Sequence, residues 1–199
     1  MNIGVWGDSI TYGSCDSEAL GWVGRLRKAR SADKDYDATY NYGLCGDTSD
    51  NLLSRFEGEF NSNVYGVELV IFAIGLNDSS VRGNDDEFIV PVDRFRENVK
   101  KLVTQGLAKG PKVCVVGLTN VDETRTVPLA GSSTQKKFLN ENVVAYDAVL
   151  KEVAEESGVT FISVFGTLSS SELADGLHPN EVGYEKLFKI ISKRLEVFK

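Results

Sequence analysis

Ser9, Asp175 and His178 are the side chains of this sequence best suited to nucleophilic catalysis. The chain contains one histidine, so imidazole chemistry near neutral pH depends on His178. A serine hydroxyl becomes a good nucleophile when a base takes its proton and a third group, usually a carboxylate, orients that base. Asp175 lies three residues before His178, so a single loop can supply both the base and its orienting carboxylate. The trio predicts acyl transfer with Ser9 as the nucleophile.

Attack on an ester carbonyl also requires donors for the negative charge that develops on the substrate oxygen, typically worth about 3 to 4 kcal/mol each. Ser9 begins a predicted helical turn, so its own N–H can point into the site. Gly46 has no Cβ to obstruct a close approach of the backbone, and Asn77 adds a side-chain amide donor. The sequence therefore contains every part of an acyl-transfer site.

The elements that must position these residues alternate between short β-rich runs and longer stretches of helical period, which is typical of βαβ units. Five predicted strands are apolar with little alternation, as expected of parallel strands covered on both faces: residues 2–6, 38–42, 68–74, 112–118 and 159–164. The predicted helices carry apolar residues three and four positions apart and span residues 19–29, 48–60, 91–107, 134–156 and 180–198.

Polar motifs follow four of the predicted strands: Gly7-Asp8-Ser9-Ile10, Gly43-Leu44-Cys45-Gly46-Asp47-Thr48, Gly75-Leu76-Asn77-Asp78 and Asp175-Gly176-Leu177-His178. In open α/β sheets, ligands bind where loops converge at the carboxyl ends of the strands. We therefore expect the four motifs to meet at that edge, with residues 75–87, 119–133 and 166–179 forming loops there.

The length and composition indicate one globular domain over residues 1–199, with 42% apolar and 26% charged residues. A net charge of −7 argues against nucleic acid as a partner. The sequence contains neither a signal peptide nor an apolar run of roughly 18 residues, so we expect no membrane span and a cytoplasmic location. Three widely spaced cysteines suit neither a disulfide framework nor a metal knuckle, and we expect buried thiols.

The four motifs resemble the four sequence blocks of the SGNH hydrolases, also called GDSL lipases and esterases, in order and over nearly the whole chain. The resemblance implies that Ser9 is the nucleophile, His178 the base and Asp175 its orienter. It also implies an oxyanion hole made by the Ser9 and Gly46 N–H groups and the Asn77 side chain, and no cofactor. The implied fold is a flavodoxin-like three-layer α/β domain with strand order 2-1-3-4-5.

Two positions depart from the family pattern or leave a choice open. Ile10 stands where the family name has leucine, which is a conservative change. Gly43 precedes Gly46 by three residues and is the alternative donor, but Gly46 leads directly into the next helix. We leave Asp8 and Asp78 unassigned, since each can cap or brace its own loop.

Two other functions use the same residues differently. A non-catalytic flavodoxin-like binding or signalling domain would gather a divalent cation with Asp8, Asp47 and Asp78. That alternative leaves His178, Asp175 and Asn77 without a role. A metal-dependent phosphoesterase is disfavoured, because one histidine and scattered aspartates make a poor two-metal site. Trp6 and Trp22 are predicted to be core residues.

The resemblance implies an ester substrate of small-molecule size within a range that includes carboxylesters, lysophospholipids, thioesters and acetylated sugars. The absence of a long apolar lid segment favours short acyl chains. The loops expected to shape the pocket are acidic, which disfavours a strongly anionic substrate: Asp85, Asp86, Glu87, Asp122 and Glu123. The sequence assigns no oligomeric state. Cys45, if exposed, would make the protein sensitive to alkylation without having a catalytic role.

Overall fold

Five parallel strands form the centre of the computed structural model, which describes residues 1–18, 20–31, 37–83 and 87–198. They are β1 (Ile3–Gly7), β2 (Thr39–Gly43), β3 (Leu69–Ala73), β6 (Lys112–Val116) and β7 (Thr160–Ile162). The order across the sheet is β2-β1-β3-β6-β7. Numbered along the chain, the sheet strands therefore follow the order 2-1-3-4-5, and the predicted α/β fold is confirmed.

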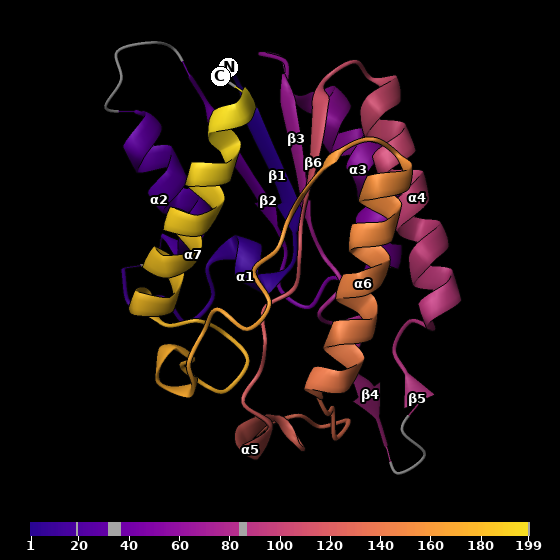
Figure 1. The fold of residues 1–199 in the computed structure, drawn as a ribbon, viewed down its shortest axis with the longest axis vertical. Helices are drawn as coiled ribbons and strands as arrows, with labels where there is room; N and C mark the ends of the chain where they lie inside the picture. The colour runs from indigo at the N-terminus through magenta and orange to yellow at the C-terminus, as the bar shows by residue number, and fades with distance from the viewer. Residues whose placement is uncertain (19, 32–36, 84–86, 199) are drawn as a thin grey trace.

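The sheet separates two hydrophobic cores because successive strand residues point to opposite faces. Trp6 and Phe72 belong to one core, whereas Val5 and Ile71 belong to the other. Figure 1 shows the helices in two layers on either side of the sheet. One layer consists of α3 (Ser49–Ser62), α4 (Val92–Ala108) and α6 (Asn140–Glu156), and the other contains α2 (Gly21–Arg30) and α7 (Glu181–Leu195).

The smaller elements lie mainly beyond the carboxyl ends of the strands, at the lower end of the view in Figure 1. They are α1 (Ser9–Tyr12), the antiparallel pair β4 (Val81–Arg82) and β5 (Glu87–Phe88), α5 (Glu123–Thr126) and a 3₁₀ turn at Ser170–Glu172. A second 3₁₀ turn, Glu196–Phe198, follows α7. The predicted carboxyl edge is therefore where the irregular segments gather.

Side chains of the residues immediately before two helices explain why these helices begin where they do. Thr48 and Asn51 form a reciprocal capping box at the start of α3. The Asn180 side chain accepts hydrogen bonds from the Val182 and Gly183 N–H groups at the start of α7. Each cap satisfies backbone donors that have no partner within the helix.

The predicted bounds of several elements require correction. The helix predicted over residues 134–156 begins at Asn140, because the backbone N–H and carbonyl of Lys137 pair with Val81 and are unavailable to a helix. The first and second strands are each shifted by one residue from the predicted ranges, and the second lies at the edge of the sheet, where Asn41 is exposed. Ala19, at the predicted start of the α2 helix, lies outside the described residues.

The cysteines also differ from the expectation of buried thiols. Cys114 is buried in the sheet, but Cys15 and Cys45 are exposed. Trp6 and Trp22 are buried, as predicted. In the part of the chain that the structure describes, no helix is both long enough and apolar enough to cross a membrane.

Candidate active site

Ser9, His178 and Asp175 form a continuous chain of hydrogen bonds at the carboxyl edge of the sheet. The Ser9 Oγ lies 2.9 Å from His178 Nε2, and His178 Nδ1 lies 2.7 Å from Asp175 Oδ2. Because a carboxylate only accepts, Nδ1 carries the hydrogen, and Nε2 of the neutral ring is then free to accept the serine proton. The arrangement can therefore move a proton from Ser9 to His178.

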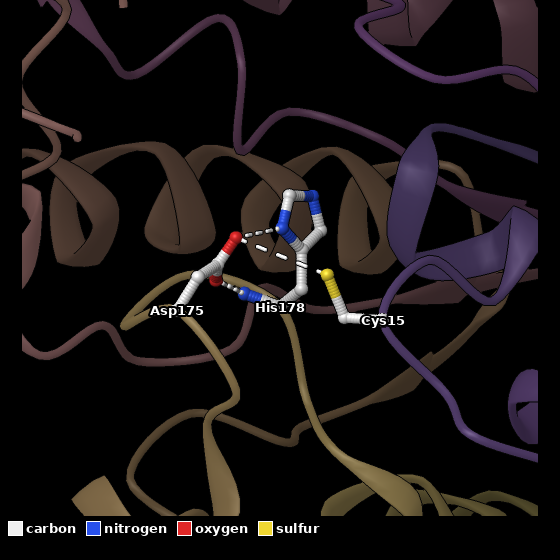
Figure 2. A group of neighbouring side chains, drawn as sticks. All are labelled: Cys15, Asp175 and His178. Atoms are coloured by element: carbon white, nitrogen blue, oxygen red, sulfur yellow. Dashed lines mark hydrogen bonds and ion pairs between the residues drawn. The ribbon is translucent and has the colours of Figure 1, made fainter. Parts of the chain in front are cut away.

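The loop between β7 and α7 fixes the orientation of the Asp175 carboxylate, whose bonds to the His178 ring and backbone are drawn in Figure 2. Asp175 Oδ1 accepts the backbone N–H groups of Leu177 and His178 at 2.9 Å and 2.7 Å. Partial burial opposes ionisation, but the hydrogen bonds from His178 and Leu177 outweigh it and hold the pKa of Asp175 well below its usual range. The carboxylate therefore stays charged beside the imidazole.

The guanidinium of Arg125 holds the same loop through its backbone carbonyl oxygens. It donates to the carbonyl oxygens of Ser170, Leu173 and Ala174 at 2.8, 2.9 and 3.1 Å. Its Nε donates to Asp122 Oδ2 at 2.9 Å, and this bond fixes the guanidinium at the start of α5. Arg125 carries no signal of this role in the sequence, because none of its three carbonyl partners is close to it along the chain.

Arg125→Lys is expected to lower kcat for ester hydrolysis by about tenfold with little change in KM. A single ammonium group cannot reproduce the planar fork that bonds three carbonyls at once, so the loop bearing Asp175 and His178 loosens. Steady-state kinetics with a chromogenic ester measures the effect. Lys186→Arg, at another basic residue that pairs with this region through Glu172, serves as a matched control. Unchanged kcat in Arg125→Lys would contradict the positioning role.

Ser9 is the first residue of α1 and is 8% exposed. Asp8 caps this short helix by accepting the Ile10 N–H at 2.9 Å. Burial raises the pKa of the Asp8 carboxyl to about 6, against the opposing effects of the Ile10 hydrogen bond and the nearby His178. Asp8, left unassigned from sequence, thus helps to hold the turn that presents Ser9.

The structure distinguishes the two candidate glycines by what surrounds them. A Cβ at Gly43 would lie 2.3 Å from the Tyr12 nitrogen, and the Gly43 N–H already donates to Asn41 Oδ1 at 2.9 Å. Gly46 lies in an exposed turn at φ 84°, with open space where a Cβ would be. Gly43 therefore permits close packing against α1, whereas the Gly46 backbone is accessible to a ligand.

Asn77 connects the loop after β3 to the turn containing Gly46. Its Nδ2 donates to the Asp47 carbonyl oxygen at 3.0 Å, and the side chain is largely buried. A primary amide carries two N–H donors, so one of them remains for a ligand while the other fixes the amide. The hydrogen bond therefore fixes the Asn77 amide against the turn that contains Gly46.

Asp78, the other unassigned aspartate, braces the start of α3. Its carboxylate accepts from the Ser49 N–H at 2.9 Å and from the Ser49 hydroxyl at 2.5 Å. Burial raises the pKa of Asp78 to about 7, although the hydrogen bonds from Ser49 favour the charged form. Asp78 thus links the loop containing Asn77 to α3, although its burial disfavours the charged carboxylate.

Asp78→Asn is expected to flatten the pH dependence of stability between about pH 4 and pH 8. The pKa of Asp78 rises from an ordinary 3.8 to about 7 on folding, so its contribution to stability is greatest below pH 4 and is lost as pH rises through 7. The stability lost between pH 4 and pH 8 corresponds to about 4 kcal/mol. Urea unfolding of both proteins at pH 4 and pH 8 measures it. Parallel pH profiles for the two proteins would contradict this prediction.

The three aspartates of the alternative cation pocket each accept a hydrogen bond from the protein: Asp8 from Ile10, Asp47 from Arg55 and Asp78 from Ser49. Among the described residues, the ligand group that does converge comprises Cys15, Asp175 and His178. The structure therefore does not favour a hard-cation pocket built from these aspartates.

Comparisons with known proteins find relatives over nearly the whole chain. The GDSL-like lipase/acylhydrolase family model matches residues 5–186. A multidomain esterase of Ruminococcus flavefaciens is 26% identical over 96% of this chain, and the chain spans 28% of that protein's length. A GDSL esterase/lipase of Arabidopsis thaliana is 27% identical over 95% of this chain and 83% of its own length. A lipase/acylhydrolase structure from Enterococcus faecalis has a TM-score of 0.77 at 25% identity, covering 98% of this chain and 94% of that one.

Proposed function

The chain belongs to the GDSL-like lipase/acylhydrolase family and is an ester-hydrolysing enzyme, and on that premise we propose that it is a serine esterase with Ser9, His178 and Asp175 as its catalytic triad. The observation that carries this proposal is the unbroken hydrogen-bonded chain from Ser9 Oγ through both ring nitrogens of His178 to Asp175. The family relationship supports ester hydrolysis, and the geometry supports the assignment of roles.

Catalysis proceeds in two halves through an acyl-enzyme. His178 Nε2 takes the proton of Ser9 as Oγ attacks the ester carbonyl carbon, and the same proton then passes to the departing alcohol. In the second half, His178 takes a proton from water, the resulting hydroxide attacks the acyl carbon, and the proton returns to Ser9 Oγ as the carboxylic acid leaves. Asp175 stabilises the imidazolium that forms in each half and does not itself take up a proton.

Three donors hold the oxyanion in both tetrahedral intermediates: the backbone N–H groups of Ser9 and Gly46 and the Asn77 side chain. The hydrogen bond from Asn77 to the Asp47 carbonyl supports this role, because it fixes two of the donors relative to each other before substrate binds. Preorganised donors avoid reorganisation during the reaction, so they stabilise the transition state more than water would.

The substrate is a small-molecule ester, and we propose a short acyl chain. Within the described residues, the loops at the carboxyl edge form the short β4–β5 pair and the four-residue α5 rather than a long apolar lid. Glu87 and Glu123 are exposed there, Glu87 in a surface ion pair with Arg82, and Asp122 is paired with Arg125. Asp85 and Asp86 lie outside the described residues. The acidic side chains that are exposed disfavour a strongly anionic ester.

A fluorophosphonate probe followed by intact-mass measurement tests the nucleophile directly. We expect one adduct on the wild-type protein and none on Ser9→Ala, together with hydrolysis of p-nitrophenyl acetate that persists in EDTA. Longer p-nitrophenyl esters should be hydrolysed more slowly. A folded wild-type protein that forms no adduct, or an equal adduct on Ser9→Ala, would overturn the assignment. Ser17→Ala, at an exposed serine in the loop after α1, provides the matched control.

A further inference from the structure

The Cys15 thiol, a side chain of a type that binds metal ions, lies beside the Asp175–His178 pair. Figure 2 shows its thiol directed toward the two side chains, with Sγ 4.0 Å from Asp175 Oδ2. One potential ligand atom from each of the three residues lies within 4.8 Å of the other two. Sulfur, imidazole nitrogen and carboxylate oxygen are the three donor types that bind zinc in proteins.

The backbone on each side of Cys15 is anchored to the rest of the fold. On one side, the Ser14 carbonyl accepts the Tyr184 hydroxyl of α7 at 2.8 Å. On the other, Asp16 is buried in an ion pair with Arg25 and accepts the Gly21 N–H at 2.7 Å. The loop bearing Asp175 is likewise held by hydrogen bonds. Cys15 and the Asp175–His178 pair therefore face each other from two segments that are each fixed to the fold.

We propose that Cys15, Asp175 and His178 form an inhibitory site for Zn²⁺, which rests on the proposed role of His178 as the catalytic base. Zinc would be bound by Cys15 Sγ, one Asp175 oxygen and His178 Nδ1, with a water in the fourth position. Ligand atoms around tetrahedral zinc are about 3.3 to 3.8 Å apart, a separation that follows from metal–ligand lengths near 2.0 to 2.3 Å. The observed separations of Asp175 Oδ2 from His178 Nδ1 and from Cys15 Sγ, 2.7 Å and 4.0 Å, lie just below and just above this range.

Metal binding at Nδ1 removes the basic nitrogen that Ser9 needs. In the metal-free enzyme, Nδ1 carries the hydrogen and Nε2 carries the lone pair. When the Nδ1 lone pair binds zinc, the neutral ring carries its hydrogen on Nε2 and cannot accept the Ser9 proton. The Cys15 thiol also releases its proton to solvent, so one proton is released for each Zn²⁺ bound. The enzyme is inhibited without any change in its fold.

The donor set also determines which metals bind. One thiolate, one imidazole and one carboxylate oxygen suit zinc and cobalt, whereas Mg²⁺ and Ca²⁺ require several oxygen ligands. Micromolar Zn²⁺ should therefore inhibit where millimolar Mg²⁺ does not, and EDTA should restore the rate.

The test compares two exposed cysteines of which only one belongs to the group. Hydrolysis of p-nitrophenyl acetate is measured against ZnCl₂ in wild type, Cys15→Ala and Cys45→Ala, each relative to its own metal-free rate. We expect Cys15→Ala to need about tenfold or more Zn²⁺ for half-inhibition, because it lacks the thiolate ligand. Cys45→Ala should match wild type. Equal zinc sensitivity in Cys15→Ala and wild type would overturn the proposal.

A spectroscopic measurement separates this site from the proposed catalytic function. Co²⁺ bound by a thiolate gives a charge-transfer absorption, which we expect in wild type, Cys45→Ala and the inactive Ser9→Ala, but not in Cys15→Ala. Cobalt binding through Cys15 in a protein without esterase activity would support the metal site and contradict the catalytic assignment. Esterase activity in a protein that gives no thiolate–cobalt absorption would overturn the metal site alone.

Discussion

Replacing Ser9 by alanine is expected to lower kcat/KM for ester hydrolysis by about 10⁴- to 10⁶-fold, and His178→Ala should cause a loss of similar size. Triad members act as a unit, so removing either the nucleophile or its base abolishes covalent catalysis and leaves what binding and the oxyanion hole provide. Steady-state kinetics with p-nitrophenyl acetate measures both losses. The Ser9 hydroxyl has His178 as its hydrogen-bond partner, so the substitution should leave the fold intact.

Two further variants test the same mechanism. Ser9→Ala combined with His178→Ala should be no slower than either single variant, because the two residues serve one step. Asp175→Ala should cost less than either, since Asp175 orients the base without reacting. Circular dichroism and thermal unfolding provide the control for folding. Near-normal turnover by Ser9→Ala or His178→Ala would refute the proposed mechanism.

Asn77→Ala is expected to lower kcat by about 10²- to 10³-fold while changing KM little. The amide donor strengthens its hydrogen bond as charge develops on the substrate oxygen, so its removal affects the transition state more than the bound substrate. The same variant also loses the hydrogen bond to the Asp47 carbonyl. Kinetics across a range of ester concentrations separates kcat from KM.

Asn77→Asp provides a nearly isosteric comparison. A carboxylate of the same size cannot donate to the oxyanion and repels it, so kcat should fall at least as far as in Asn77→Ala. Fluorophosphonate labelling of Ser9 at long incubation times confirms that the nucleophile is still present in both variants. An unchanged kcat in Asn77→Asp would exclude Asn77 from the oxyanion hole.

Residue periodicity predicted most of the fold, and its failures share one cause. The segment at residues 134–139 has the local pattern of a helix, but the backbone of Lys137 pairs with Val81 from a distant segment. Similarly, β2 was expected to be covered on both faces, although a strand's place at the edge of a sheet depends on its neighbours. Local patterns report what a segment prefers and do not reveal which other segment competes for its hydrogen bonds.

The sequence by itself determined the α/β architecture and the identities of Ser9, Asp175 and His178 as chemically competent residues, because residue type, periodicity and the uniqueness of the histidine are properties of the linear chain. Tertiary structure alone decided that Gly43 packs against the Tyr12 backbone, that Arg125 holds the loop of the base, and that the Cys15 thiol lies beside Asp175. Such contacts join segments far apart along the chain, and only packing of the complete fold brings them together.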